Sequence, residues 1–214
     1  MTGERDGTKS GAVYIIDPDE RRRAHIAEAF AERDLRPKPV DDIKDFGQTP
    51  PSEGYAFVAD EHRAENAVAA LRARWPEVPL VAYSIHPSPE KIVRAMLYGA
   101  QDYLEWPFDA HLLDQAFERL AHEAQKGSHQ ATHETVTTAA SAQVENLTPR
   151  EREVLALLVQ GMSNKSIGKT LGISPRTVEI HRGNMMRKLH AQSAADAVRI
   201  AIYAGVDEGF LLQD

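Results

Sequence analysis

Cysteine is absent from this 214-residue sequence. Disulfide bonds, zinc sites built on thiolates and cysteine nucleophiles are therefore excluded. Long apolar runs are absent too, because the longest aliphatic stretch, Val154 to Val159, is far too short to cross a bilayer. The N-terminus is polar and charged and lacks the apolar core of a signal peptide. These absences predict a soluble, cytoplasmic protein that has no membrane partner.

Negative charge is concentrated in the first two thirds of the chain. Residues 1–142 contain 16 Lys and Arg against 24 Asp and Glu, whereas residues 143–214 contain 9 against 8. Between Gly161 and His190 there are six basic residues and one acid, which gives a local net charge of +5. The uneven distribution of charge favours two domains. Because a basic segment suits a phosphate backbone, we expect the C-terminal domain to bind nucleic acid.

Three helix-start signals follow one another in the C-terminal third of the chain. Thr148 and Glu151 have the spacing of a capping box. Ser163 and Ser174 are suited to cap the next two helices, and Gly172 lies between those helices as a stop signal. Two helices joined by a tight turn that contains glycine are typical of a helix-turn-helix, which lays its second helix in the DNA major groove.

The last of these three helices has two distinct faces when its residues are placed at about 100° intervals. The predicted core face consists of Val178, His181, Met185 and Leu189. The face predicted to enter the groove consists of Arg176, Glu179, Ile180, Gly183 and Arg187. Phosphate contacts are predicted for Lys165, Thr177 and Lys188, with Arg182 at the edge. Glu179 could accept a hydrogen bond from cytosine, and Ile180 could lie near a thymine methyl group.

These motifs closely resemble the LuxR-type helix-turn-helix domain, in particular its FixJ/NarL response-regulator branch. The resemblance spans Val144 to Gly209 and is carried by LTPREREVL, SNKSIGKTLGIS and TVEIHRGNMMRKL. It implies a four-helix domain that binds double-stranded DNA. Gly183 departs from the family pattern, which often has a base-reading side chain at this position, so the sequence preference is expected to differ there.

The last predicted helix begins after Ser193, ends near Gly205 and is rich in small residues. Its candidate dimerisation residues are Ala194, Ala197, Val198 and Ala201. The family resemblance favours a homodimer on DNA that binds half-sites about one helical turn apart. The same side chains suit the core of a single domain equally well, so both interpretations stay open.

Short apolar strands and helices alternate five times between residues 12 and 123. Strands are predicted at residues 12–16, 37–40, 55–59, 80–83 and 102–104. The first helix is predicted to pack through Ala24, Ala27, Phe30 and Ala31. This alternation indicates a parallel sheet covered by helices on both faces, with function at the carboxyl ends of the strands. Residues 124–143 have little to pack and are predicted to be a linker.

Acidic residues follow the first and third predicted strands. Asp17, Asp19 and Asp60 could converge at the edge of the sheet and hold Mg²⁺ weakly. No other cofactor is indicated. Acids at strand ends also cap helices or face solvent, and the sequence alone gives this simpler interpretation about equal weight.

Residues 12–123 also resemble a two-component receiver domain. The resemblance is carried by VYIIDPDE, YAFVAD, VAYS and GAQDYLEWPF. It implies a flavodoxin-like (βα)5 fold in which Asp60 takes the phosphoacceptor position, Ser84 the switch hydroxyl and Tyr103 the switch aromatic. It also implies a histidine kinase or another signalling protein as a partner.

Three departures from the receiver pattern argue against efficient phosphorylation. Pro18 replaces the second acid of the usual pair, Trp106 replaces the lysine that would neutralise a phosphoryl group, and the loop after Asp60 lacks its usual Pro and Gly. Asp19 or Glu61 could partly replace the lost ligand. Trp106 is expected to place its indole beside Asp60. This atypical receiver is therefore predicted to be a dimerisation or protein-interaction module.

The leading hypothesis is a DNA-binding response regulator without enzyme activity. One alternative is a conventional regulator that is activated by phosphorylation of Asp60. A second is a phosphatase of the haloacid-dehalogenase type, because Asp17 and Asp19 form a DxD after an apolar strand, although Arg21 stands where that family has Thr or Val. A third is an interaction protein that keeps the helix-turn-helix fold without binding DNA.

Overall fold

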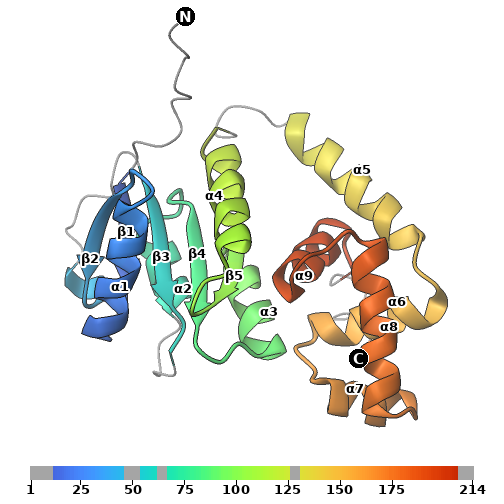
Figure 1. The fold of residues 1–214 in the computed structure, drawn as a ribbon. Helices are drawn as coiled ribbons and strands as arrows, with labels where there is room; N and C mark the ends of the chain where they lie inside the picture. Colours follow the sequence, from blue (N-terminus) through green and yellow to red (C-terminus); the bar gives the residue numbers. More distant parts are fainter. Residues whose placement is uncertain (1–11, 46–53, 62–66, 126–130, 207–214) are drawn as a thin grey trace, which may run out of the picture. The chain divides into compact units, whose positions relative to one another are not determined.

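The computed structural model describes residues 12–45, 54–61, 67–125 and 131–206 (Figure 1). The chain divides into two compact units. The first contains residues 1–86 and 98–125, and the second contains residues 87–97 and 126–214. Within the described residues, no helix combines the length and apolar character that a membrane span requires.

The first unit is built on a five-stranded parallel sheet. Its strands are β1 (Ala12–Ile16), β2 (Arg36–Val40), β3 (Tyr55–Ala59), β4 (Leu80–Ser84) and β5 (Asp102–Glu105). The spatial order is β2-β1-β3-β4-β5, which confirms the predicted alternation and fold class. The strand order reverses between β1 and β3, so the residues that follow these two strands meet at one edge of the sheet.

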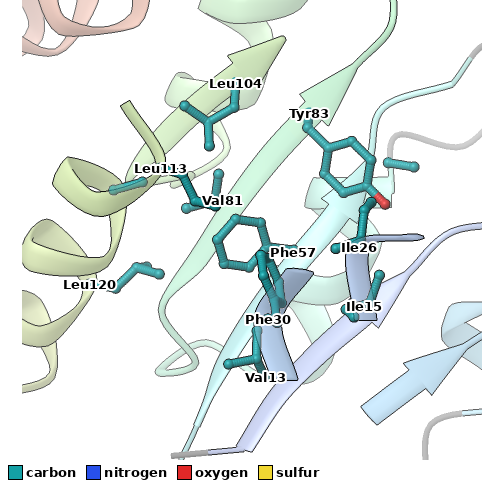
Figure 2. Packing of buried hydrophobic residues seen from close by; sticks show 12 residues of the cluster. Val13, Ile15, Ile26, Phe30, Phe57, Val81, Tyr83, Leu104, Leu113 and Leu120 are labelled. Atoms are coloured by element: carbon teal, nitrogen blue, oxygen red, sulfur yellow. The ribbon is translucent and has the colours of Figure 1, made fainter. Parts of the chain in front are cut away.

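Helices lie against the sheet in the first unit. They are α1 (Glu20–Ala31), α2 (Ala67–Arg74) and α4 (Ala110–Gln125), with a short 3-10 helix η1 (Ile43–Asp45) after β2. One face of the sheet packs against α1 and α4 around Phe30 and Phe57, whose ring centroids lie 4.8 Å apart (Figure 2). Alternation along a strand directs neighbouring residues to the opposite face. Helix α2 contacts β3 and buries Val68 and Leu71 outside this cluster.

The buried face of α1 agrees only in part with the one predicted. Ala24 and Ala31 are exposed, whereas Arg22, Ile26 and Phe30 are buried. These three residues are four positions apart and therefore lie on one side of the helix. Phe30 and the partly buried Ala27 pack as predicted, whereas Ala24 and Ala31 do not, because the buried face begins with the charged residue Arg22.

The second unit is helical. It contains α3 (Pro89–Leu97), α5 (Ala131–Glu145), α6 (Pro149–Val159), α7 (Asn164–Leu171), α8 (Pro175–Lys188) and α9 (Ala194–Tyr203). Helix α3, which the sequence assigned to the receiver, groups with this unit because it contacts α9 and α6.

The predicted linker contains a helix, so this prediction was wrong for residues 131–143. Helix α5 contacts α9, buries Ala140 and donates a hydrogen bond of 3.0 Å from Gln143 Nε2 to the carbonyl of Leu189. Alanine has the highest helix propensity, and a helix can pack closely through small side chains. The scarcity of large apolar residues therefore did not exclude a packed element.

The caps of the helix-turn-helix match the sequence prediction. Thr148 and Glu151 form a reciprocal capping box, and the side chains of Ser163 and Ser174 each accept a backbone hydrogen bond at the start of α7 and α8. Gly172 ends α7 in the left-handed conformation, with φ of 67°. Gly168 allows close packing at the turn, because a Cβ atom there would lie 2.7 Å from the carbonyl oxygen of Ile173.

Helix α9 is not an exposed surface in this conformation. Ala197, Val198 and Ala201 are fully buried, and Ala194 is partly buried. The helix contacts α3, α5 and α6 within the second unit. Three of the four candidate dimerisation residues are therefore core residues here, which agrees with the core interpretation that the sequence left open and not with an exposed contact face.

Replacing Val198 with Asp should unfold the second unit, because the carboxylate would be buried without a partner. We expect the free energy of unfolding to fall by roughly 3 kcal/mol or more in a denaturation experiment. Ala194→Asp is the matched control, since an acid in the first turn of a helix is tolerated or favourable. A Val198→Asp variant with wild-type stability would show that this face is open in solution.

Candidate DNA-binding surface and receiver site

The two faces of α8 are separated as the helical repeat predicted. Val178, Met185 and Leu189 are fully buried, and His181 is partly buried. The opposite side exposes Arg176, Glu179, Ile180, Gly183 and Arg187. Ile180 is 58% exposed, which is unusual for a large aliphatic side chain on a folded domain. This side of α8 is thus open to a partner.

Gly183 leaves open space at the centre of this exposed side. A Cβ atom added at this residue would meet no other atom within 4 Å. The glycine is therefore not required by packing inside the protein. Its lack of a side chain allows a partner to approach the α8 backbone closely beside Ile180.

Two of the predicted phosphate-contact residues, Arg182 and Thr177, also make contacts inside the domain. Arg182 Nη1 donates to Asn164 Oδ1 at 2.7 Å and so joins α8 to α7. The Thr177 hydroxyl lies 2.8 Å from that of the cap residue Ser174. Lys165, by contrast, is exposed on α7.

Lys188 forms an ion pair that the sequence did not reveal. Its Nζ atom lies 2.7 Å from Glu151 Oε2, and Glu151 is buried while Lys188 is about one third exposed. Burial opposes ionisation of Glu151, but hydrogen bonds from Lys188 and Thr148 outweigh it and lower the pKa of the carboxyl. Lys188 thus ties the end of α8 to the start of α6.

The carboxyl edge of the sheet contains a buried charge pair. Arg22 donates to both carboxylate oxygens of Asp17, with Nε–Oδ2 and Nη2–Oδ1 distances of 2.5 and 2.7 Å. Asp17 is fully buried and Arg22 is 7% exposed. The hydrogen bond to Asp17 raises the pKa of the Arg22 guanidinium, so this side chain stays charged. Bidentate pairs of this kind are among the strongest polar contacts in proteins.

Two further groups complete the surroundings of Asp17. The Tyr83 hydroxyl donates to Asp17 Oδ2 at 2.7 Å, and the backbone N–H of Asp19 donates to Oδ1 at 2.8 Å. Burial and the neighbouring Asp17 charge raise the pKa of Tyr83, which keeps its phenol protonated. Arg22 Nη1 also lies 2.9 Å from Glu61 Oε1, although the geometry is not that of a hydrogen bond.

The predicted magnesium triad is not assembled. Asp19 caps α1, accepting the backbone N–H of Arg22 at 2.8 Å, and this hydrogen bond lowers the pKa of its exposed carboxyl. Asp17 is neutralised by Arg22. Among the residues that the structure describes, no group of three or more His, Asp or Glu side chains is arranged to hold a metal ion. The simpler interpretation, in which one of these acids caps a helix, applies to Asp19.

The structure brings together the predicted phosphoacceptor and switch residues. The Tyr103 hydroxyl lies 3.1 Å from Asp60 Oδ2 and 3.0 Å from Ser84 Oγ. All three residues are nearly fully buried. Asp60 directly follows β3, Ser84 is the last residue of β4, and Tyr103 lies within β5.

Trp106 is joined to Ser84 through its backbone, while its ring contacts Phe108. Its ring centroid lies 4.9 Å from that of Phe108 in an edge-on arrangement, and its backbone N–H donates to the carbonyl of Ser84 at 2.9 Å. The indole therefore belongs to the margin of the core cluster around Phe30 and Phe57.

Arg22 and Tyr83 are the site residues that the sequence analysis missed. Arg22 is four residues before Ile26 and eight before Phe30, so a basic residue in line with two core residues was a usable signal. Tyr83 gave no such signal, because its hydroxyl reaches Asp17 across 66 positions of the chain.

Comparison with known proteins agrees with this architecture. Residues 145–201 match the family described as "Bacterial regulatory proteins, luxR family". The chain is 31% identical over 204 residues to the transcriptional regulatory protein FixJ of Bradyrhizobium diazoefficiens, a match that covers 93% of this chain and 98% of the relative. It is 37% identical to FixJ of Rhizobium meliloti over 212 residues, covering 90% of this chain and 96% of the relative.

A solved structure of full-length FixJ from B. japonicum shares 30% of its residues with this chain. The structural match covers 91% of this chain and 97% of that one, with a TM-score of 0.48. The sequence identities extend through both units and over nearly the whole length of these relatives. The chain therefore belongs to the FixJ-like response regulators of the luxR family.

Proposed function

We propose that this protein is a transcription regulator that binds double-stranded DNA through α8. The exposed side of that helix carries the proposal, because it offers two arginines, an acid and an aliphatic side chain where a recognition helix meets base edges. The buried residues on the other side fix the orientation of the helix. Membership of the luxR family supports the same function.

The roles proposed within the surface follow from exposure. Arg176 and Arg187 can donate to guanine or phosphate, Glu179 can accept from cytosine, and Ile180 can contact a thymine methyl group. Lys165 is placed for a phosphate contact. Lys188 and Arg182 are less suited to phosphates than the sequence suggested, because each makes a hydrogen bond inside the domain.

The receiver is proposed to act as a dimerisation or protein-interaction module without conventional phosphorylation of Asp60. Trp106 stands where a receiver usually has a lysine, which supports a receiver that is not phosphorylated in the conventional way. The Arg22 guanidinium beside Asp17 supports the same proposal. A homodimer on DNA and a signalling protein such as a histidine kinase are the proposed partners. Dimerisation through α9 would require Ala197, Val198 and Ala201 to become uncovered.

Of two other candidate functions, the structure offers support for one and argues against the other. Conventional activation is the second candidate, because Asp60, Ser84 and Tyr103 are hydrogen-bonded together. A phosphatase of the haloacid-dehalogenase type would need Asp17 as its nucleophile. That carboxylate instead accepts hydrogen bonds from Arg22 and Tyr83, which argues against such a role.

Glu179→Ala and Lys165→Ala should separate base contacts from phosphate contacts. With a duplex selected from random sequences, Glu179→Ala should change the preferred sequence at one or two positions. Lys165→Ala should weaken binding to all duplexes alike and reduce the slope of log affinity against log salt by about 1. Fluorescence anisotropy over a salt series measures both effects. Wild-type behaviour of both variants would exclude α8 and α7 as the DNA-binding surface.

Replacing Asp60 with Asn should leave DNA binding almost unchanged. We expect the affinity for the selected duplex to change less than about twofold, because no phosphoryl group is proposed to act at this carboxylate. Arg176→Ala is the positive control, since it should weaken binding without altering the receiver. If Asp60→Asn abolished binding or dimerisation while the protein stayed folded, conventional activation would be the correct account.

A further inference from the structure

The family of this receiver implies a divalent cation at the acidic edge of the sheet, and the residues present do not fit one. A Mg²⁺ ion requires carboxylate oxygens that are open to it, usually with several water ligands. Both oxygens of Asp17 already accept charge-assisted hydrogen bonds from Arg22, and Oδ2 accepts a further one from Tyr83. Asp19 faces away to cap α1.

We propose that the Arg22 guanidinium is a built-in cation that replaces Mg²⁺ in this receiver. It lies between the carboxylates of Asp17 and Glu61, at the edge of the sheet where the family's metal would be held. A second positive charge beside the guanidinium would be repelled strongly in this buried setting. The site is therefore neutralised permanently and does not respond to divalent cations.

The position of Arg22 on α1 makes this arrangement rigid. The residue is followed at four-residue intervals by Ile26 and Phe30, both fully buried in the core of the first unit. Packing of α1 therefore aims the guanidinium at the end of β1. The adjoining Arg23 donates to the backbone carbonyl of Asp17 and pairs with Asp41 at 2.5 Å, which anchors the same turn of the helix.

The charge pair has a consequence for the switch residues. Tyr83 donates to Asp17, and the backbone carbonyl of Tyr83 accepts the N–H of Asp60 at 2.7 Å. Asp60 in turn is hydrogen-bonded to Tyr103, which reaches Ser84. One connected set of contacts thus runs from the internal cation to the switch aromatic.

The inference rests on the proposed function in one respect, namely that the receiver works without phosphorylation. Its test uses the full-length protein and Mg²⁺ alone, without DNA. A failure of this test is therefore distinct from a failure of DNA binding or of the Asp60→Asn result.

Thermal unfolding in EDTA and in about 10 mM MgCl2, at matched ionic strength, tests the built-in cation directly. The melting temperature of the wild type should not respond to Mg²⁺. Arg22→Ala should melt at a lower temperature in EDTA, because Asp17 loses its counter-ion, and Mg²⁺ should restore several degrees. Arg21→Ala, an exposed neighbour on α1, is the matched control and should behave like the wild type. Arg22→Lys keeps the charge and should show no Mg²⁺ response.

Two results would overturn the proposal. One is a wild-type protein that Mg²⁺ stabilises as much as Arg22→Ala. The other is an Arg22→Ala variant with wild-type melting temperature and no response to Mg²⁺. If Arg22→Ala does not fold, Mn²⁺ titration of the wild type by electron paramagnetic resonance decides, because Mn²⁺ prefers the same oxygen ligands. Saturable binding at about 1 mM or below would contradict a site already filled by Arg22.

Discussion

The buried pair of Asp17 and Arg22 constrains the carboxyl edge of the sheet. A carboxylate that is fully removed from water is stable only when it is neutralised and hydrogen-bonded, and Arg22 and Tyr83 meet both conditions. Removing either partner of such a pair commonly costs about 3–5 kcal/mol of stability. The conformations of the first turn of α1 and of the ends of β1 and β4 are therefore tied to this contact.

In the second unit, the two sides of α8 have different roles. Val178, Met185 and Leu189 bury one side of α8, and the Glu151–Lys188 pair fixes its far end. The exposed side is then free to vary without loss of the fold. Gly183 illustrates this freedom, because the space around it would accept a side chain without any internal rearrangement.

Local patterns were enough to predict much of the fold. Strands such as Tyr55–Ala59 are short apolar runs that end at a polar residue, and the caps Thr148, Ser163 and Ser174 act on their own turns. These signals depend only on neighbours in sequence, so they can be recognised without knowledge of the tertiary structure. The convergence of Asp60, Ser84 and Tyr103 followed from the resemblance to a receiver and from the parallel sheet.

Contacts between distant residues were not predictable in the same way. The sequence did not reveal that Arg22 turns inward to Asp17 or that Lys188 pairs with Glu151, and it could not decide between a buried and an exposed face for α9. Each depends on which surface a neighbouring helix covers. Helix α5 was missed for a related reason, because alanine-rich segments pack only when a partner such as α9 is close.

We propose that this FixJ-like receiver works without phosphorylation of Asp60. The most direct measurement is the intact mass and oligomeric state of the wild-type protein after incubation with acetyl phosphate and Mg²⁺. If Asp60 is not phosphorylated, the mass should be unmodified and the oligomeric state unchanged. Stoichiometric addition of a phosphoryl group, accompanied by a change in oligomeric state that Asp60→Asn does not show, would contradict it.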